Sequence, residues 1–311
     1  MCALESRERC DLYLSVALAQ KRGMSRPFTM AFSGAELDHC DTERTPEHLE
    51  NTAVEPDARA LVFGKYGPAV DELGQPLSVH PSKLDTQPIF LGRELDTRRP
   101  WFAATDLSLP PERTPDLRMT AGGMDPRALA LVGRARSLLH WHRHSGYCAN
   151  CGGPTTMDKG GAVRHCTACE REIYPLVTPV AIMLVEHDDC LLLGRQAGWP
   201  PGSFSALAGF VSPGEDLEEC CAREVMEEVG VRVRNVRYLM SQAWPFPHQL
   251  MLGLACEAEG RELTVDTHEL ETAEWFSRAE VEAVWAKTGE AFRRPPRFTV
   301  AHQLIRAWLE G

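Results

Sequence analysis

The amino-acid sequence predicts an α/β protein with more than one domain, in which strands form the centre of the larger domain and helices its outside. The chain has 311 residues, enough for roughly two domains with their own cores. Its second half alternates apolar runs of strand length with helical patterns, as layered α/β folds do. Four cysteines in two close pairs separate this half from a first half of strand-like segments.

The first predicted domain covers residues 1–125 and is rich in strands. Apolar runs at 60–63, 88–91 and 101–103 have the composition of strands. Proline and glycine residues between these runs predict turns. We find no pattern of catalytic or metal-binding side chains in this domain.

The second predicted domain, residues 126–175, joins a helix to a metal-binding segment. The helix is expected from Pro126 to about Ser145, because apolar residues recur at helical spacing and proline suits a first turn. Two Cys-x-x-Cys pairs follow, separated by fourteen residues that contain several glycines. The pairs consist of Cys148, Cys151, Cys166 and Cys169.

This cysteine spacing predicts a zinc ribbon. Four thiolates complete the tetrahedral shell of Zn²⁺ and leave no position for a substrate, so the site is expected to be structural. A redox Cys-x-x-Cys motif is the alternative, but it would leave the second pair without a role.

The third predicted domain, residues 176–311, contains most of the regular structure. Strands are expected at 180–185, 190–193, 204–211, about 231–241, 249–257 and near 275–276. Helices are expected after Glu215, at about 278–287 and at about 300–309.

The helix after Glu215 gathers acidic side chains on one face. Glu224, Glu227 and Glu228 stand at positions i, i+3 and i+4, so they project together. Like charges at this spacing cost roughly a few tenths of a kcal/mol per pair unless a cation lies between them. Clustered carboxylates of this kind suit Mg²⁺ or Mn²⁺, with substrate phosphates completing the shell.

The segment from Gly209 to Val231 fills every fixed position of the pattern Gly-x5-Glu-x7-Arg-Glu-hydrophobic-x-Glu-Glu-x-Gly-hydrophobic. It therefore resembles the Nudix box of the Nudix hydrolases. A solvated acidic helix, the simpler interpretation, would not also supply both glycines and the arginine at these places. The resemblance implies an α/β/α sandwich with a mixed sheet, preceded here by the zinc ribbon and the strand-rich domain. It also implies hydrolysis of a diphosphate joined to a nucleoside.

A second motif resembles the SQPWPFPxS signature of the NADH pyrophosphatase subgroup. It runs from Ser241 to Gln249, and its prolines predict a stiff, extended loop. Ala243 replaces the usual proline and Gln249 the usual serine, so the loop is expected to be less rigid and to lack one hydroxyl contact. A proline-rich surface turn is the alternative interpretation.

The resemblance implies a role for each matching residue of the Nudix box. Mg²⁺ or Mn²⁺ would be held by Glu224, Glu228, Glu269 and the backbone carbonyl of Ala208. Glu227 would lie beside them as a ligand or a base. Arg223 is expected to pair with Glu215 and so to fix the helix against the preceding loop.

The resemblance also implies a substrate pocket. Its expected lining is Gln242, Ala243, Trp244, Pro245, Phe246, Pro247, His248, Gln249 and the backbone at Ala301. Phe210 and Tyr174 match positions that stack on the base, and Tyr174 would come from the partner subunit of a homodimer. Phe210 as a core residue is the alternative.

The function implied by these motifs is hydrolysis of NAD(H) to a nicotinamide mononucleotide and AMP, extending to NAD caps at RNA 5′ ends. Alternatives are an ADP-ribose or other nucleoside-diphosphate hydrolase, a non-catalytic Nudix ligand sensor, and a zinc-ribbon module for nucleic acid. A sensor should have lost carboxylates, and all of them are present here.

Charge and cysteine content restrict partners and compartment. With 33 basic and 44 acidic residues, the net charge of −11 predicts no broad surface for nucleic acid. No apolar run reaches the length of a membrane span. The apolar stretch 12–19 resembles a secretory signal, but acidic residues replace the positive charges that should precede it. Eleven cysteines, an odd number, favour a reducing compartment, so we expect a cytoplasmic protein.

Overall fold

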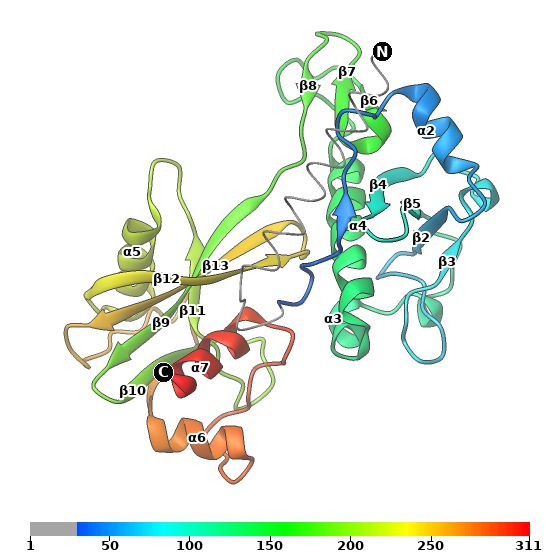
Figure 1. Ribbon diagram of the computed structural model, residues 1–311. Coiled ribbons are helices and arrows are strands. Elements are labelled where there is room, and N and C mark those ends of the chain that lie inside the picture. Colours follow the sequence, from blue (N-terminus) through cyan, green and yellow to red (C-terminus); the bar gives the residue numbers. More distant parts are fainter. Residues whose placement is uncertain (1–29) are drawn as a thin grey trace. The chain divides into compact units, whose positions relative to one another are not determined.

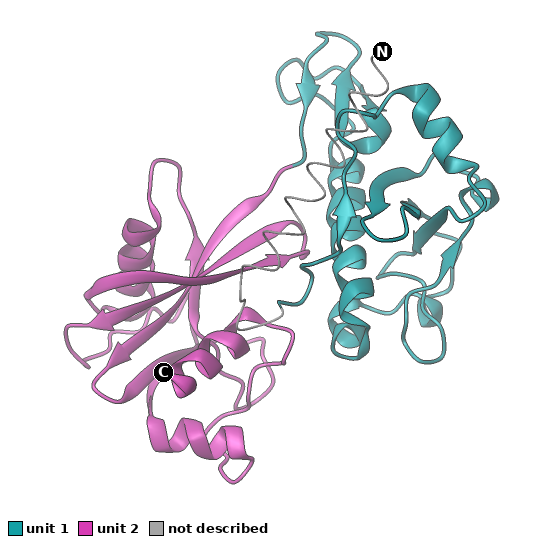
Figure 2. Ribbon diagram, viewed as in Figure 1, with its two compact units in different colours: residues 1–175 teal, residues 176–311 magenta. Residues whose placement is uncertain are grey.

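The computed structural model of the protein describes residues 30–311. The chain divides into two compact units, residues 1–175 and residues 176–311 (Figure 2). The apolar stretch 12–19 lies outside the described residues. Each unit is built around its own sheet.

The first unit contains a five-stranded sheet in the order β1-β4-β5-β2-β3. The predicted strands at 60–63, 88–91 and 101–103 are confirmed as β2, β4 and β5. Strands β2 and β5 are parallel, and the other pairs are antiparallel. The strands are β1 (Leu37–Asp38), β2 (Arg59–Phe63), β3 (Ser78–Val79), β4 (Ile89–Glu94) and β5 (Pro100–Thr105).

Helix α2 (Pro46–Ala53) of this unit, the longer of the two α-helices that precede Pro126 among the described residues, was not predicted. It begins after Thr45, whose side chain accepts a hydrogen bond from the backbone N–H of His48. Threonine before a proline is a helix start signal that could have been read from the sequence. Shorter helical turns are η1 (Pro81–Lys83), η2 (Pro111–Arg113), α3 (Leu117–Thr120) and η3 (Ala121–Gly123).

The predicted helix after Asp125 is confirmed as α4 (Pro126–His144). The Asp125 carboxylate accepts the backbone N–H groups of Arg127 and Ala128 and so caps the first turn. Leu129 and Val132 are buried where α4 packs against β2, β4 and β5 (Figure 1).

The cysteine-rich segment forms a three-stranded antiparallel sheet in the first unit. Its elements are β6 (Thr155–Asp158), η4 (Lys159–Gly161), β7 (Val163–Cys166) and β8 (Glu172–Ile173). The buried Arg44 donates to the backbone carbonyls of Phe90 and Lys159 at 3.2 and 3.1 Å, which joins this segment to β4. A side chain at Gly160 would come within 2.9 Å of Leu49, so the two parts approach closely only at a glycine.

The second unit contains a six-stranded mixed sheet. Its order is β12-β13-β9-β10-β14, with β11 paired to β9. Strands β9 and β13 are parallel, and the other pairs are antiparallel. The strands are β9 (Thr178–His187), β10 (Cys190–Arg195), β11 (Leu207–Phe210), β12 (Val233–Trp244), β13 (Gln249–Ala258) and β14 (Thr272–Ser277).

Helices cover both faces of this sheet (Figure 1). They are α5 (Leu217–Val229), α6 (Arg278–Ala286) and α7 (Val300–Glu310). Met183 packs in one core cluster with Val225 of α5. The adjacent Ile182 pairs with Gly253, which faces Leu304 of α7. Since neighbouring strand residues point to opposite faces, α5 and α7 lie on opposite sides, which confirms the predicted α/β/α sandwich.

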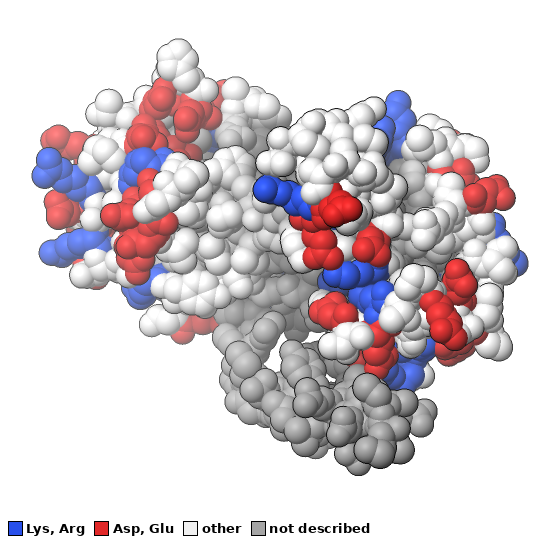
Figure 3. Space-filling model, turned by 90° about the horizontal axis from the view of Figure 1, so that it is seen from above, with Lys and Arg blue, Asp and Glu red and all other residues white. Residues whose placement is uncertain are grey.

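The surface carries mixed charge. On the face shown in Figure 3, Lys and Arg side chains lie beside Asp and Glu side chains instead of forming one basic field. This face therefore offers local and not extended attraction for phosphates. Among residues 30–311, no helix combines the length and apolar character that a membrane span requires.

Candidate active site

Helix α5 is fixed at both ends by residues of the Nudix box and its neighbours. Asp216 and Glu219 form a capping box, in which each side chain accepts the backbone N–H of the other residue. The helix ends at Gly230, which is left-handed with φ 72°. A side chain there would also lie 2.9 Å from Thr264, so both conformation and space require glycine.

Three carboxylates converge beside α5. Glu224 and Glu228 are 8% and 5% exposed, whereas Glu269 is exposed. One oxygen of each lies within 4.8 Å of the others. The segment that carries Glu269 is tied to the end of α5, because the Asp266 N–H donates to the Glu228 carbonyl at 2.9 Å. The main chain thus brings Glu269, 41 positions after Glu228, to the helix.

The electrostatics of this cluster favour a cation. Burial, with the charges of Glu224 and Glu269 added, raises the pKa of Glu228 to about 8. The buried Oε2 of Glu228 has no hydrogen-bond partner among the described residues. A buried carboxylate oxygen without a donor is costly, and a divalent cation would supply its partner. The donor set, oxygen only, fits Mg²⁺ or Mn²⁺.

Gly209 of β11 leaves the space that Glu224 occupies. A Cβ atom built on Gly209 would lie 1.8 Å from Cδ of Glu224. Only glycine therefore allows this carboxylate to lie against the strand. Ala208, whose carbonyl was predicted as a ligand, is the preceding residue of the same strand.

Arg223 connects parts of the Nudix box through hydrogen bonds to three carboxylates and one backbone carbonyl. Its guanidinium donates to both carboxylate oxygens of Glu215 and to the Phe210 carbonyl at 3.0 Å. It also donates to Glu224 and Glu227, each at 2.8 Å. The Arg223 hydrogen bond lowers the pKa of Glu215 to about 2. Arg223 thus orients a carboxylate of the cluster as well as the loop, a contact that the sequence did not indicate.

The hairpin between β12 and β13 carries the second motif. Gln242 is 1% exposed, and its amide donates to the Phe298 carbonyl and accepts the Val300 N–H, both at 2.7 Å. It therefore fixes the segment that leads into α7, whose first turn contains Ala301. The Trp244 ring lies 4.9 Å from that of Phe246 and stacks with Phe298 at 6.2 Å.

Phe298 was not predicted as a site residue. The only local signal is the proline pair that precedes it, and its contact with Trp244 depends on the tertiary fold. The other residues of the motif, from Ala243 to Gln249, form the end of β12, the turn and the start of β13.

One row of paired residues crosses the sheet at this site. Phe210, Val180, Met251 and Gln242 are neighbours on β11, β9, β13 and β12. Paired residues share a face, so Phe210 and Gln242 lie on the face that α7 covers, opposite to α5. Phe210 is 54% exposed, so it does not belong to the core of this unit.

Tyr174 lies in the first unit, in the segment that follows β8. It is 62% exposed, and its hydroxyl donates to Glu172. This hydrogen bond leaves the ring face available for stacking, because it uses only the phenolic oxygen.

The four predicted zinc ligands lie together. Their sulfur atoms fall within 4.8 Å of one another. Sγ of Cys148 is 3.8 Å from that of Cys169, and Sγ of Cys151 is 3.5 Å from that of Cys166. Tetrahedral Zn²⁺ with Zn–S bonds of about 2.3 Å requires sulfur separations of about 3.8 Å, so the arrangement fits zinc. Backbone N–H groups of Ala168 and Cys169 lower the pKa of Cys166 to about 6, which favours the thiolate.

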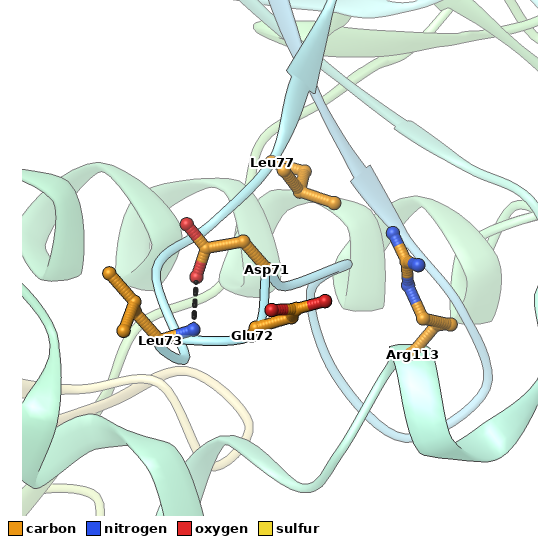
Figure 4. Close-up of a pocket in the computed structure, with 5 residues that line it drawn as sticks. All are labelled: Asp71, Glu72, Leu73, Leu77 and Arg113. Atoms are coloured by element: carbon orange, nitrogen blue, oxygen red, sulfur yellow. Dashed lines mark hydrogen bonds between the residues drawn. The ribbon is translucent and has the colours of Figure 1, made fainter.

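A pocket in the first unit has a different character (Figure 4). It is lined by Asp71, Glu72, Leu73, Leu77 and Arg113. The Asp71 carboxylate accepts the backbone N–H groups of Leu73 and Gln75, so it stabilises its own turn. None of the predicted site residues lines this pocket.

Comparison with protein-family models identifies three parts of the chain. Residues 175–297 match the NUDIX domain, and residues 143–174 match the NADH pyrophosphatase zinc ribbon domain. Residues 47–141 match the NADH pyrophosphatase-like rudimentary NUDIX domain, which gives the strand-rich first half an identity that its sequence did not reveal.

The chain is also similar to individual relatives. It is 37% identical over 225 residues to NAD-capped RNA hydrolase NudC of Stutzerimonas stutzeri (strain A1501), covering 72% of this chain and 75% of that one. It is 44% identical over 191 residues to human NAD-capped RNA hydrolase NUDT12, covering 58% of this chain. The human mitochondrial NAD(P)H pyrophosphatase NUDT13 is 38% identical, with 63% of this chain and 59% of that one covered.

These likenesses show that the chain belongs to the Nudix hydrolase family. Within it, the zinc ribbon and rudimentary domain place the chain in the NADH pyrophosphatase subgroup. The chain spans 41% of the length of human NUDT12, so that relative contains a large part that has no counterpart in the match.

Replacing Gly209 tests the metal cluster. Gly209→Ala should lower the affinity for Mn²⁺ about 10- to 100-fold, because the new methyl group displaces Glu224. Isothermal titration with Mn²⁺ measures the change, and circular dichroism checks the fold. Gly198→Ala is the matched control, since a Cβ there meets nothing within 4 Å. Equal Mn²⁺ affinity in the two variants would contradict the assignment of Glu224.

The zinc ribbon makes a second prediction. The purified chain should contain one zinc per molecule, and Cys148→Ser should lose it and melt at a lower temperature, because metal binding contributes to folding. Elemental analysis and thermal unfolding measure both effects. Cys190→Ser, outside the cluster, is the control. A Cys148→Ser protein that retains zinc would refute the ligand set.

Proposed function

We propose that the protein hydrolyses the diphosphate bond of NAD(H), giving a nicotinamide mononucleotide and AMP, with Mg²⁺ or Mn²⁺ as the cofactor. The observation that carries this proposal is the buried, unpartnered carboxylate of Glu228 beside Glu224 and Glu269. Diphosphate is protected by its own negative charge, and cations held by these carboxylates would neutralise it. Family membership and the names of the relatives support the choice of NAD(H).

Residues of the chain would hold the cations, orient the carboxylates and accept a proton. Glu224, Glu228, Glu269 and the Ala208 carbonyl would hold the cations. Arg223 keeps Glu224 and Glu227 oriented, and its bond to Glu215 keeps the preceding loop in place. Glu227 is exposed and adjacent to the cluster, so it serves as a further ligand or as the base that accepts a proton from water.

The substrate pocket is proposed to lie along the row from Phe210 to Gln242. Phe210 presents an exposed ring for stacking on a base. The hairpin residues Ala243, Trp244, Pro245, Phe246, Pro247, His248 and Gln249 would line the pocket, together with the backbone at Ala301. Both polar atoms of Gln242 are used within the protein, so its role is to shape this wall.

We also propose that the protein acts as a homodimer in the cytoplasm. An exposed Tyr174 is suited to stack on a base bound by the partner subunit. Eleven cysteines, an odd number, support a reducing compartment.

NAD-capped RNA is a second proposed substrate. Its cap contains the same diphosphate, and two relatives carry the name NAD-capped RNA hydrolase. A non-catalytic sensor is disfavoured, because the carboxylate cluster is complete.

Glu228→Gln should reduce kcat for NADH at least about a hundredfold while the protein stays folded, because it removes a central charge of the cluster. The assay compares kcat/KM for NADH, NAD, ADP-ribose and NAD-capped RNA with Mg²⁺ or Mn²⁺. Glu218→Gln, exposed on the first turn of α5, is the control. Turnover of Glu228→Gln within about tenfold of wild type would refute the cluster's role, and preferred hydrolysis of ADP-ribose would refute the substrate.

A nucleobase site formed by two subunits leads to a further prediction. Phe210→Ala and Tyr174→Ala should each weaken substrate binding by about 1 to 3 kcal/mol, the range for a lost stacking face. If the two rings come from different subunits, mixing the two weakened variants should restore part of the activity, since one site of each mixed dimer is intact. Light scattering that shows only monomers, or no recovery while subunits exchange, would rule out a shared site.

A further inference from the structure

A short basic segment follows α6, and it differs in charge from the acidic chain as a whole. This segment, residues 293–298, has the sequence Arg-Arg-Pro-Pro-Arg-Phe. We call it the arginine loop. It contributes three positive charges and no negative one to a chain whose net charge is −11.

The arginine loop is held rigidly. The Arg293 N–H donates to the Gly202 carbonyl at 2.6 Å, and Nδ1 of the buried His302 contacts the Pro295 carbonyl at 2.9 Å. The Gln303 amide donates to the Arg297 carbonyl at 3.0 Å. Two consecutive prolines restrict the backbone further. Side chains on this loop therefore lose little backbone freedom when they bind a ligand.

Two of the three guanidinium groups of the arginine loop are available to bind a ligand. Arg293 and Arg297 are exposed, and no carboxylate of the described residues lies within 4.0 Å of either guanidinium. Arg294 differs, since it lies over the Trp285 ring and donates to the Trp285 carbonyl. Burial lowers the pKa of His302, the hydrogen bond to the Pro295 carbonyl opposes this shift, and the charges of Arg294, Arg297 and Arg306 add smaller decreases.

The arginine loop lies next to the residues that are proposed to line the substrate pocket. Its last residue, Phe298, accepts a hydrogen bond from Gln242 and stacks with Trp244. Four neighbouring strands carry the row from Phe210 to Gln242, so the Cα atoms of these two residues are about 14 Å apart. A ligand that stacks on Phe210 and continues along this row reaches the arginine loop only if it extends beyond one nucleotide.

We propose that Arg293 and Arg297 bind backbone phosphates of the RNA chain that continues from an NAD cap. This inference rests on the proposed function. A rigid basic loop beside the stacked rings of Trp244 and Phe298 is the combination by which proteins hold single-stranded nucleic acid. Because the rest of the chain is acidic, the contacts are few, and the affinity should depend on salt only weakly but measurably.

A single 2′-phosphate, as in NADPH, is the smaller ligand that shares this chemistry. Arg293 and Arg297 stand four positions apart on a proline-containing segment, with Arg293 before the two prolines and Arg297 in the turn from Pro296 to Thr299. Two separated guanidinium groups match successive phosphates of a chain better than one phosphate. The experiment therefore includes NADPH beside RNA.

The test compares wild type with Arg293→Gln/Arg297→Gln. The binding probe is a single-stranded RNA of about twelve nucleotides that begins with 5′-AMP, the product of cap removal, followed by fluorescence anisotropy. Two lost contacts should reduce the slope of log K against log salt by about 1.4. Between about 50 and 200 mM salt, wild-type affinity should thus fall about sevenfold more than that of the variant. kcat/KM for NADH should stay within about twofold.

Arg232→Gln is the matched control. Arg232 is exposed in the same unit and stands ten positions before Gln242, about 33 Å along the strand. This variant removes a positive charge without approaching the loop, so its salt slope should equal that of wild type.

Three other outcomes overturn the inference. An equal loss of kcat/KM for NADH would show that the arginines support the shared pocket. A loss confined to NADPH would assign the loop to a 2′-phosphate. An unchanged salt slope would exclude phosphate contacts. If wild type fails to hydrolyse NADH, the proposed function fails, but RNA binding by the two proteins still decides whether the loop contacts the chain.

Discussion

The structure of the catalytic unit depends on burying two like charges side by side. Glu224 and Glu228 are nearly inaccessible, and Glu269 lies within reach of both. In a low-dielectric site, neighbouring carboxylates repel one another strongly unless a cation lies between them. The arrangement of the box follows from this constraint. Gly209 leaves room for Glu224, Arg223 orients it, and Gly230 lets the chain turn back so that the Glu269 segment can pair with the end of α5.

On the opposite face of the same sheet, an uncharged side chain joins two segments of the chain. The buried amide of Gln242 joins the hairpin of β12 and β13 to the segment before α7 through two hydrogen bonds. Leaving either backbone group unpaired in the interior would cost about 1 to 3 kcal/mol, so these two hydrogen bonds hold the end of the arginine loop beside the hairpin. The carboxylate cluster beside α5 and the side chains of Phe210 and Gln242 thus lie on opposite faces of the sheet.

In the first unit, a buried arginine connects the five-stranded sheet to the zinc ribbon. Arg44 donates to backbone carbonyls of β4 and of the zinc ribbon, and the ribbon's glycines allow the close approach. Four thiols at zinc-like separations form a site at which a bound zinc would add binding energy to the folding of the ribbon. The match of residues 47–141 to a rudimentary Nudix domain shows that this sheet keeps a family fold in a segment where we found no catalytic pattern.

The sequence by itself determined the features that depend on local spacing: the strands of the second unit, the helix from Pro126, the cysteine pairs and the carboxylates at i, i+3 and i+4. It missed α2, although Thr45 before Pro46 is a readable start signal. The domain boundaries and the individual site residues remain predictions. Only the tertiary structure decided that Glu224 of α5 requires a glycine on strand β11, that Gln242 is used internally, and that Phe298 borders the hairpin. Those contacts join residues far apart in the chain. The spacing of residues along the sequence does not indicate which distant side chains meet when the chain folds.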